Sequence, residues 1–241
     1  MTVRYDGTRY YGWEHQPGKD TVQGKLEEVL ARLMESPVDV IGAGRTDAGV
    51  HARAMTANAV LDTDLSAEEI RRYMNRYLPD DISVNALEIC AERFHARYKA
   101  VGKTYRYTFW YDSDGRKPVF DRKYVYVLKE KPDVDAMRKA AEYLMGEHDF
   151  RSFNGNSHFK KSSVRNVDTI RIEESGSYIR LYFHGTGFLQ NMVRILAGTL
   201  LEAGYGRKAP EDMVRILEAR DRKEAGPTLP PQGLCLMKVD Y

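Results

Sequence analysis

The chain has 241 residues, 42% hydrophobic and 30% charged, which is the composition of an ordinary folded protein and excludes intrinsic disorder. Its formal net charge of +2 gives little sign of a polyanionic partner, unless the positive charge is clustered. Two cysteines, Cys90 and Cys235, exclude a disulfide framework, and we expect both to be buried thiols. The sequence shows no secretory signal or membrane-spanning run, so we expect a cytoplasmic protein without a membrane partner.

The first part of the chain predicts elements in the order β-α-β-β-α-β. Apolar residues with helical spacing begin at Val22, where Thr21 is the expected N-cap. Ser66 and Glu69 form a capping-box signature for a second helix that stops at Pro79. We expect strands over residues 1–6, up to 41, 54–61 and 82–90.

The second part repeats this order with two additions, a supplementary strand over 124–128 and a short helix opened by Pro210. Its first strand alternates, so that the aromatic side chains of 105, 107, 109 and 111 share one face. A helix over 134–145 is expected to end at Gly146, and a later helix through Met192 is closed by Gly204. Further strands are expected at 164–173, 178–184 and the C-terminus.

This pattern predicts an α+β fold of two tandem ferredoxin-like or RRM-like βαββαβ halves. Their antiparallel sheets could join edge to edge, which would hide exposed edge strands. A central catalytic cleft between the halves is then the natural place for a site. We expect the N-terminal half to comprise residues 1–99 and the C-terminal half 100–241.

The segment 43–52, AGRTDAGVHA, fits neither a helix nor a strand comfortably, because it is rich in glycine. It brings Arg45, Asp47 and His51 close together. One interpretation is a turn in which Asp47 bonds its own backbone and the two basic side chains face water. The other is a functional loop.

Positive charge is clustered in two acid-free runs that also contain Phe and Tyr. Basic residues interleaved with aromatic ones suit phosphate contact and base stacking, which favours RNA, although solvated strand faces would show the same pattern. The basic residues of the two runs are Arg93, Arg97, Lys99, Lys103, Arg106, Arg151, Lys160, Lys161 and Arg165.

The sequence gives no sign of a metal site or a nucleotide cofactor. The six histidines show no metal-ligand spacing, and no glycine-rich phosphate loop occurs. Arg194 lies in an otherwise apolar helical stripe, and arginines are seldom buried without a partner. It could extend to the surface from the edge of the stripe, or it could reach a carboxylate in the cleft, for which Asp47 is the candidate.

Six blocks of the chain, in order, resemble those of the TruA family of tRNA pseudouridine synthases, and the resemblance spans nearly the full chain. Glu14, where the family more often has glutamine, and Cys235, where an aromatic residue is common, depart from its pattern, and neither belongs to the proposed catalytic set. The blocks are Tyr5–Trp13, Thr21–Leu30, Gly42–Ala52, Lys103–Tyr107, Gly187–Arg194 and Pro230–Leu236.

The resemblance implies roles for four residues. Asp47 corresponds to the family's catalytic aspartate, and Arg45 to its neighbour, which helps to hold the surroundings of a flipped-out uridine. Tyr105 corresponds to the tyrosine that stacks on the target base, and Arg194 to the basic residue that pairs with the catalytic aspartate. The resemblance further implies a homodimer, no cofactor or metal, and uridines of the tRNA anticodon arm, just 3′ of the anticodon, as targets.

Two other functions compete with this one. A non-catalytic tandem RRM-like RNA-binding protein would have the same fold, but no RNP-type aromatic motif stands on a central strand. A small hydrolase that uses Asp47 and His51 would need an orienting partner and an oxyanion site, and the sequence shows neither.

Overall fold

A computed structural model describes all 241 residues, which form two compact units. Unit 1 comprises Met1–Val101 together with Cys235–Tyr241, and unit 2 comprises Gly102–Leu234. The closing strand β11 (Leu234–Asp240) therefore lies with unit 1, whereas the sequence places it in the C-terminal half. β11 pairs in parallel with β3 of unit 1, with Cys235 opposite His51 and Leu236 opposite Ala52.

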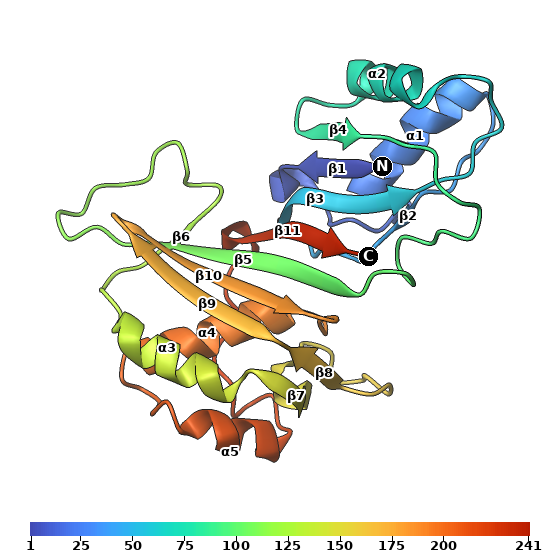
Figure 1. Ribbon diagram of the computed structural model, residues 1–241. Coiled ribbons are helices and arrows are strands. Elements are labelled where there is room, and N and C mark those ends of the chain that lie inside the picture. The colour runs from blue at the N-terminus through green and yellow to red at the C-terminus, as the bar shows by residue number, and fades with distance from the viewer. The chain divides into compact units, whose positions relative to one another are not determined.

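Unit 1 has the expected β-α-β-β-α-β order, followed at the end of the chain by β11 (Figure 1). Its strands run β4-β1-β3, all antiparallel, and β2 pairs with the other edge of β3. The elements are β1 (Thr2–Tyr5), a 3-10 turn (Gly7–Arg9), α1 (Val22–Met34), β2 (Ile41–Gly42), β3 (His51–Asn58), α2 (Ala67–Tyr77) and β4 (Ile82–Ala86).

Both predicted helix starts in unit 1 are confirmed. The Thr21 hydroxyl accepts a hydrogen bond from the backbone N–H of Gly24. Ser66 and Glu69 form the complete capping box, in which each side chain accepts from the backbone N–H of the other residue. These bonds satisfy backbone donors that the first helical turn leaves without intrahelical partners.

We expect Ser66→Ala to lower the free energy of unfolding by about 1 kcal/mol, because the substitution removes the N-cap acceptor of α2. Urea denaturation measures this change. Ser36→Ala, at an exposed serine without a capping role, is the matched control and should change stability by less than about 0.5 kcal/mol. Equal effects of the two substitutions would contradict a role for the capping box in stability.

Several strand boundaries in unit 1 differ from the prediction. β3 runs from His51 to Asn58 instead of over 54–61, and β4 ends at Ala86, well short of residue 90. β4 is short because its partner β1 begins at Thr2, which pairs with Ala86, so the ladder has no further strand to pair with. Cys90 lies beyond the strand and is exposed, which corrects the expectation of a buried thiol; Cys235 is buried as expected.

Unit 2 has a central antiparallel sheet in the order β5-β10-β9, with β6 parallel to β5, and a separate β7-β8 pair. Figure 1 shows α3, α4 and α5 as its helices. The elements are β5 (Gly102–Trp110), β6 (Tyr126–Val127), α3 (Val134–Tyr143), β7 (Gly146–Asp149), a 3-10 turn (Phe150–Phe153), β8 (Val164–Val167), β9 (Thr169–Ser175), β10 (Tyr178–Gly185), α4 (Met192–Gly204), α5 (Asp212–Ala219) and a 3-10 turn (Pro231–Gly233).

The alternation predicted for β5 is confirmed for Tyr105, Tyr107 and Phe109, which are all buried in the core of unit 2. Tyr111, predicted on the same face, lies beyond the end of the strand and is half-buried. The single strand expected over 164–173 is two strands. β8 pairs with β7, β9 pairs with β10, and the chain changes sheets at Asp168. β7 was not predicted, because the sequence from Gly146 to Asp149 has no apolar alternation to mark a strand.

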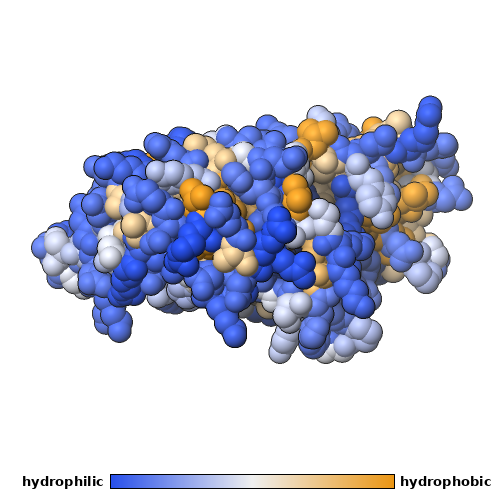
Figure 2. Space-filling model, turned by 90° about the horizontal axis from the view of Figure 1, so that it is seen from below, coloured by the Kyte–Doolittle hydropathy of each residue, from blue (hydrophilic) through white to orange (hydrophobic).

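The chain has no helix that is both long enough and apolar enough to cross a lipid bilayer. On the face shown in Figure 2, hydrophilic residues predominate and hydrophobic ones appear as small separate groups. Small scattered apolar groups are normal for a protein surface.

Candidate active site

The segment 43–50 is an irregular loop between β2 and β3, and we call it the β2–β3 loop. Within it Asp47 is half-buried and Arg45 is exposed, forming an ion pair with Glu14. Thr46 between them is buried, and its hydroxyl is hydrogen-bonded to the Tyr5 hydroxyl at 2.8 Å. Thr46 is thus held inside the protein, whereas Arg45 beside it is exposed to solvent.

The backbone of the β2–β3 loop is fixed by the N-terminal segment 5–13. The Trp13 N–H donates to the Thr46 carbonyl at 3.0 Å, and the Gly49 N–H donates to the Tyr10 carbonyl at 3.3 Å. Gly12 has a φ of +93°, and a Cβ there would lie 2.6 Å from the Thr46 carbonyl oxygen. Only glycine permits both this backbone conformation and this close approach. The β2–β3 loop therefore packs directly against the backbone of segment 5–13 at Gly12.

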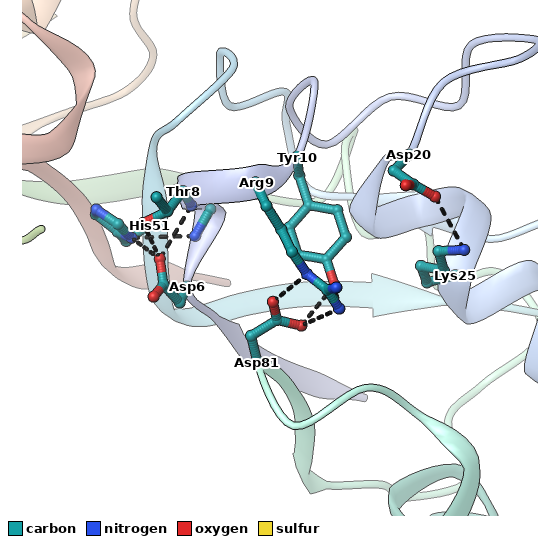
Figure 3. Close-up of polar contacts among 9 residues, drawn as sticks. Asp6, Thr8, Arg9, Tyr10, Asp20, Lys25, His51 and Asp81 are labelled. Carbon is teal, nitrogen blue, oxygen red and sulfur yellow. Dashed lines mark hydrogen bonds and ion pairs between the residues drawn. The ribbon is translucent and has the colours of Figure 1, made fainter.

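His51 anchors the end of the loop in a buried polar network (Figure 3). The Gly7 N–H donates to His51 Nδ1 at 3.0 Å, and the Asp6 carboxylate lies 3.1 Å from the same nitrogen. Because Nδ1 accepts the Gly7 bond, the neutral ring carries its proton on Nε2. A Cβ on Gly7 would lie 2.0 Å from the Val50 carbonyl oxygen, so this turn also requires glycine.

A second cluster attaches the same segment to the residue before β4 (Figure 3). The Tyr10 hydroxyl donates to the Asp81 carboxylate at 2.5 Å, and the Arg9 guanidinium pairs with that carboxylate. Burial, together with the bond to Asp81, raises the pKa of Tyr10 well above its ordinary value. Tyr10 therefore remains a protonated donor. Segment 5–13 is thus bound to His51 of β3 through Gly7 and to Asp81, the residue before β4, through Tyr10.

In unit 2, Arg194 lies in the first turn of α4 and is half-buried. Its Nε donates to the Leu229 carbonyl at 2.6 Å, and its Nη1 donates to Asn191 Oδ1 at 2.8 Å. The guanidinium is thus held from two sides by unit 2 and does not simply extend into solvent from the edge of the apolar stripe.

Tyr105 lies on β5, with 8% of its surface exposed. The Phe188 ring meets it edge-on, with 5.3 Å between the ring centroids. Two residues further along, the Tyr107 hydroxyl donates to the Pro230 carbonyl at 2.8 Å. Burial raises the pKa of Tyr107, and the charge of Arg194 opposes this rise.

The structure brings the predicted residues together in two sets. Arg45 and Asp47 share the β2–β3 loop of unit 1, whereas Tyr105 and Arg194 stand on β5 and α4 of unit 2, two elements that pack against each other. Pairing of Asp47 with Arg194 would join residues of different units and stays a prediction. Sequence reasoning missed Phe188 and Asn191, although both lie in the block Gly187–Arg194.

The second basic run divides into exposed and structural members. Lys160 and Lys161 are exposed in the segment before β8. Arg165 is half-buried, burial lowers its pKa, and its Nη1 donates to the carbonyls of Ser162 and Val164. The two lysines, like Arg151, are therefore exposed members of this run that phosphate can reach.

The chain contains no group of three or more His, Cys, Asp and Glu side chains placed to hold a metal ion.

Comparison with known proteins defines the class of this fold and site. A model of the tRNA pseudouridine synthase family matches residues 1–99 and 140–241, and the chain belongs to this family. Arg45, Asp47 and Arg194 lie inside the matched residues, whereas Tyr105 lies in the gap between them.

Within the family, the chain is similar over its whole length to proteins named tRNA pseudouridine synthase A. One, tRNA pseudouridine synthase A 2 of Clostridium perfringens (strain 13 / Type A), is 42% identical and the match covers 100% of this chain and 98% of the relative. That of Geobacter sp. (strain M21) is 45% identical, covering 100% and 97%. That of Bacillus sp. (strain KSM-64) is 43% identical, covering 94% and 92%. These matches support the TruA resemblance, and those that cover the whole chain include Tyr105.

Proposed function

We propose that this protein isomerises uridine to pseudouridine in the anticodon arm of tRNA, just 3′ of the anticodon, with Asp47 as its catalytic carboxylate. The full-length match to tRNA pseudouridine synthase A proteins carries the activity. The geometry of the β2–β3 loop supports the residue, because Asp47 stands half-buried on a backbone that segment 5–13 holds in place.

The reaction breaks the N1–C1′ bond of uridine, turns the base, and joins C5 to C1′. C5 loses a proton, N1 gains one, and there is no net redox change. The target base must first leave its stack, at a cost of about a few kcal/mol. The site then needs an ionised carboxylate, a surface to hold the detached base, and exclusion of water.

Four residues of this chain would supply these functions. Asp47 would attack C1′, attack C6 or deprotonate the sugar, and all three routes use the same ionised carboxylate. Arg194 would be its counter-charge, since a nearby cation favours the charged form. The Tyr105 ring would stack on the base. Exposed Arg45 would contact phosphates or the vacated stack, which requires it to exchange its ion pair with Glu14.

A non-catalytic RNA-binding function is not favoured, because the relatives that match the whole chain are named as synthases. We further propose a cytoplasmic homodimer that works without a metal or cofactor. Light scattering gives the oligomeric state, and activity in the presence of a chelator tests the metal independence. A monomer under assay conditions, or activity lost to the chelator, would contradict these two parts.

Neutralising Lys160 and Lys161 together should weaken tRNA binding and flatten its dependence on salt. Each phosphate contact contributes up to about 0.9 to the slope of log K against log salt, and both side chains are exposed. The double variant Lys160→Gln/Lys161→Gln is compared with the wild type by filter binding across a salt series.

The control is Lys139→Gln/Lys223→Gln, which makes the same charge change at two other exposed lysines. We expect the control to keep the wild-type slope. If the two double variants have the same slope, Lys160 and Lys161 form only a solvated face.

A further inference from the structure

Asn191 stands at a backbone position that favours glycine, and its side chain does not cap the helix that follows. It is the N-cap residue of α4 and has left-handed dihedrals, φ 58° and ψ 4°. Glycine adopts this conformation with the least strain, because it has no Cβ. An N-cap side chain normally accepts a bond from the first turn of its helix, but the Asn191 side chain makes no such bond.

The amide group of Asn191 is instead placed between Gly155 and Arg194. Its Oδ1 accepts from Arg194 Nη1 at 2.8 Å. Its Nδ2 lies against Gly155, where a Cβ would come within 2.6 Å of that nitrogen. The Gly155 N–H donates to the Gln190 carbonyl at 2.8 Å, which fixes the glycine beside the amide. The surroundings of α4 are therefore shaped to hold this amide in one position.

The contact with Asn191 contributes to the orientation of the Arg194 guanidinium. The Nε bond to the Leu229 carbonyl, at 2.6 Å, holds one nitrogen of the planar group. The Nη1 bond to Asn191 Oδ1, at 2.8 Å, holds a second nitrogen, and two donors bound to two acceptors define the plane of the group better than one. Orientation matters for a cation that must face a carboxylate.

We propose that Asn191 is a positioning residue, which holds Arg194 in the orientation needed to face the catalytic carboxylate. This inference rests on the proposed function for the role of Arg194. The left-handed backbone is then the conformation that directs the Asn191 amide toward Arg194 rather than toward the N-terminus of α4.

Asn191→Gly separates the amide from the backbone, because glycine suits the left-handed conformation and lacks only the side chain. We expect kcat to fall about 10- to 100-fold, as for other losses of an orienting contact. The Kd for tRNA should not change, and the Tm should remain within about 4 °C of the wild type. Asn191→Asp keeps the acceptor oxygen and tolerates the backbone, so it should restore most of the lost rate.

Glu35→Gly is the matched control. Glu35 is also a non-glycine residue with positive φ, 52°, at the C-cap of α1, and its replacement makes the same backbone change in unit 1. It should keep the wild-type kcat. Wild-type activity in Asn191→Gly would overturn the inference, and so would an Asn191→Gly variant that unfolds, because the amide would then support the fold instead.

A measurement that needs no activity separates this inference from the proposed function. In ¹⁵N NMR spectra, rotation of the Arg194 guanidinium should be hindered in the wild type and in Asn191→Asp, and faster in Asn191→Gly. Equal rotation in all three proteins would overturn the inference even if the wild type makes pseudouridine. If the wild type makes none, the proposed function fails, and the rotation rates still decide whether Asn191 holds Arg194.

Discussion

Asp47→Asn should abolish pseudouridine formation while the protein still folds and binds tRNA. The substitution keeps the size and shape of the side chain and removes the negative charge that every route to the product requires. Loss of a central catalytic group of this kind costs about 10⁴-fold or more. Single-turnover assays on one tRNA give the rate, and filter binding gives the Kd for the same tRNA.

Asp47 is half-buried, and the hydrogen bonds that fix the backbone of the β2–β3 loop run through Thr46, Trp13 and Tyr10. Asp62→Asn is the matched control, since it removes one exposed carboxylate elsewhere in unit 1 and should leave the rate unchanged. Turnover above a few per cent of the wild type in Asp47→Asn would remove Asp47 from its catalytic role.

The second large effect is expected at Tyr105, where Leu should be far worse than Phe. Phe keeps the aromatic face and loses only the hydroxyl, whereas Leu loses the stacking surface. Stacking of a base on an aromatic side chain contributes about 1–3 kcal/mol, so Tyr105→Leu should be slower by about 5- to 150-fold. Single-turnover rates for both variants on one tRNA provide the comparison.

Packing provides the competing explanation for Tyr105, because its ring is buried and meets Phe188 edge-on. Tm values for both variants show how much stability the packing contributes, and only rates from folded protein are compared. If both variants work at nearly the wild-type rate, Tyr105 only packs. If both are folded and inactive, the hydroxyl and not the ring does the work.

Local sequence signals predicted the elements that depend on local physics. Thr21 and the pair Ser66 and Glu69 cap their helices as expected, because a cap is a contact between residues three positions apart. The alternation of β5 correctly placed Tyr107 and Phe109 in a core. Strand ends were predicted less well, because they depend on the partner strand: β4 ends at Ala86, opposite the start of β1.

In the candidate site, too, features set by the local sequence were predicted and features set by distant contacts were not. The composition of 43–52 predicts an irregular loop, which the structure confirms for 43–50, and the functional roles within it stay predictions that the resemblance implies. The sequence does not show that Gly7 and Gly12 must be small for segment 5–13 to lie against this loop, because each contact joins residues more than thirty positions apart. The role of Asn191 was equally hidden, since it depends on a left-handed backbone and on the direction of one amide.

Mapping pseudouridine in an unmodified tRNA transcript after incubation with the purified protein tests the central claim most directly. The wild-type protein, without added metal or cofactor, should produce pseudouridine in the anticodon arm, just 3′ of the anticodon, and Asp47→Asn should produce none. A wild-type protein that binds the tRNA but leaves every uridine unchanged would contradict the account.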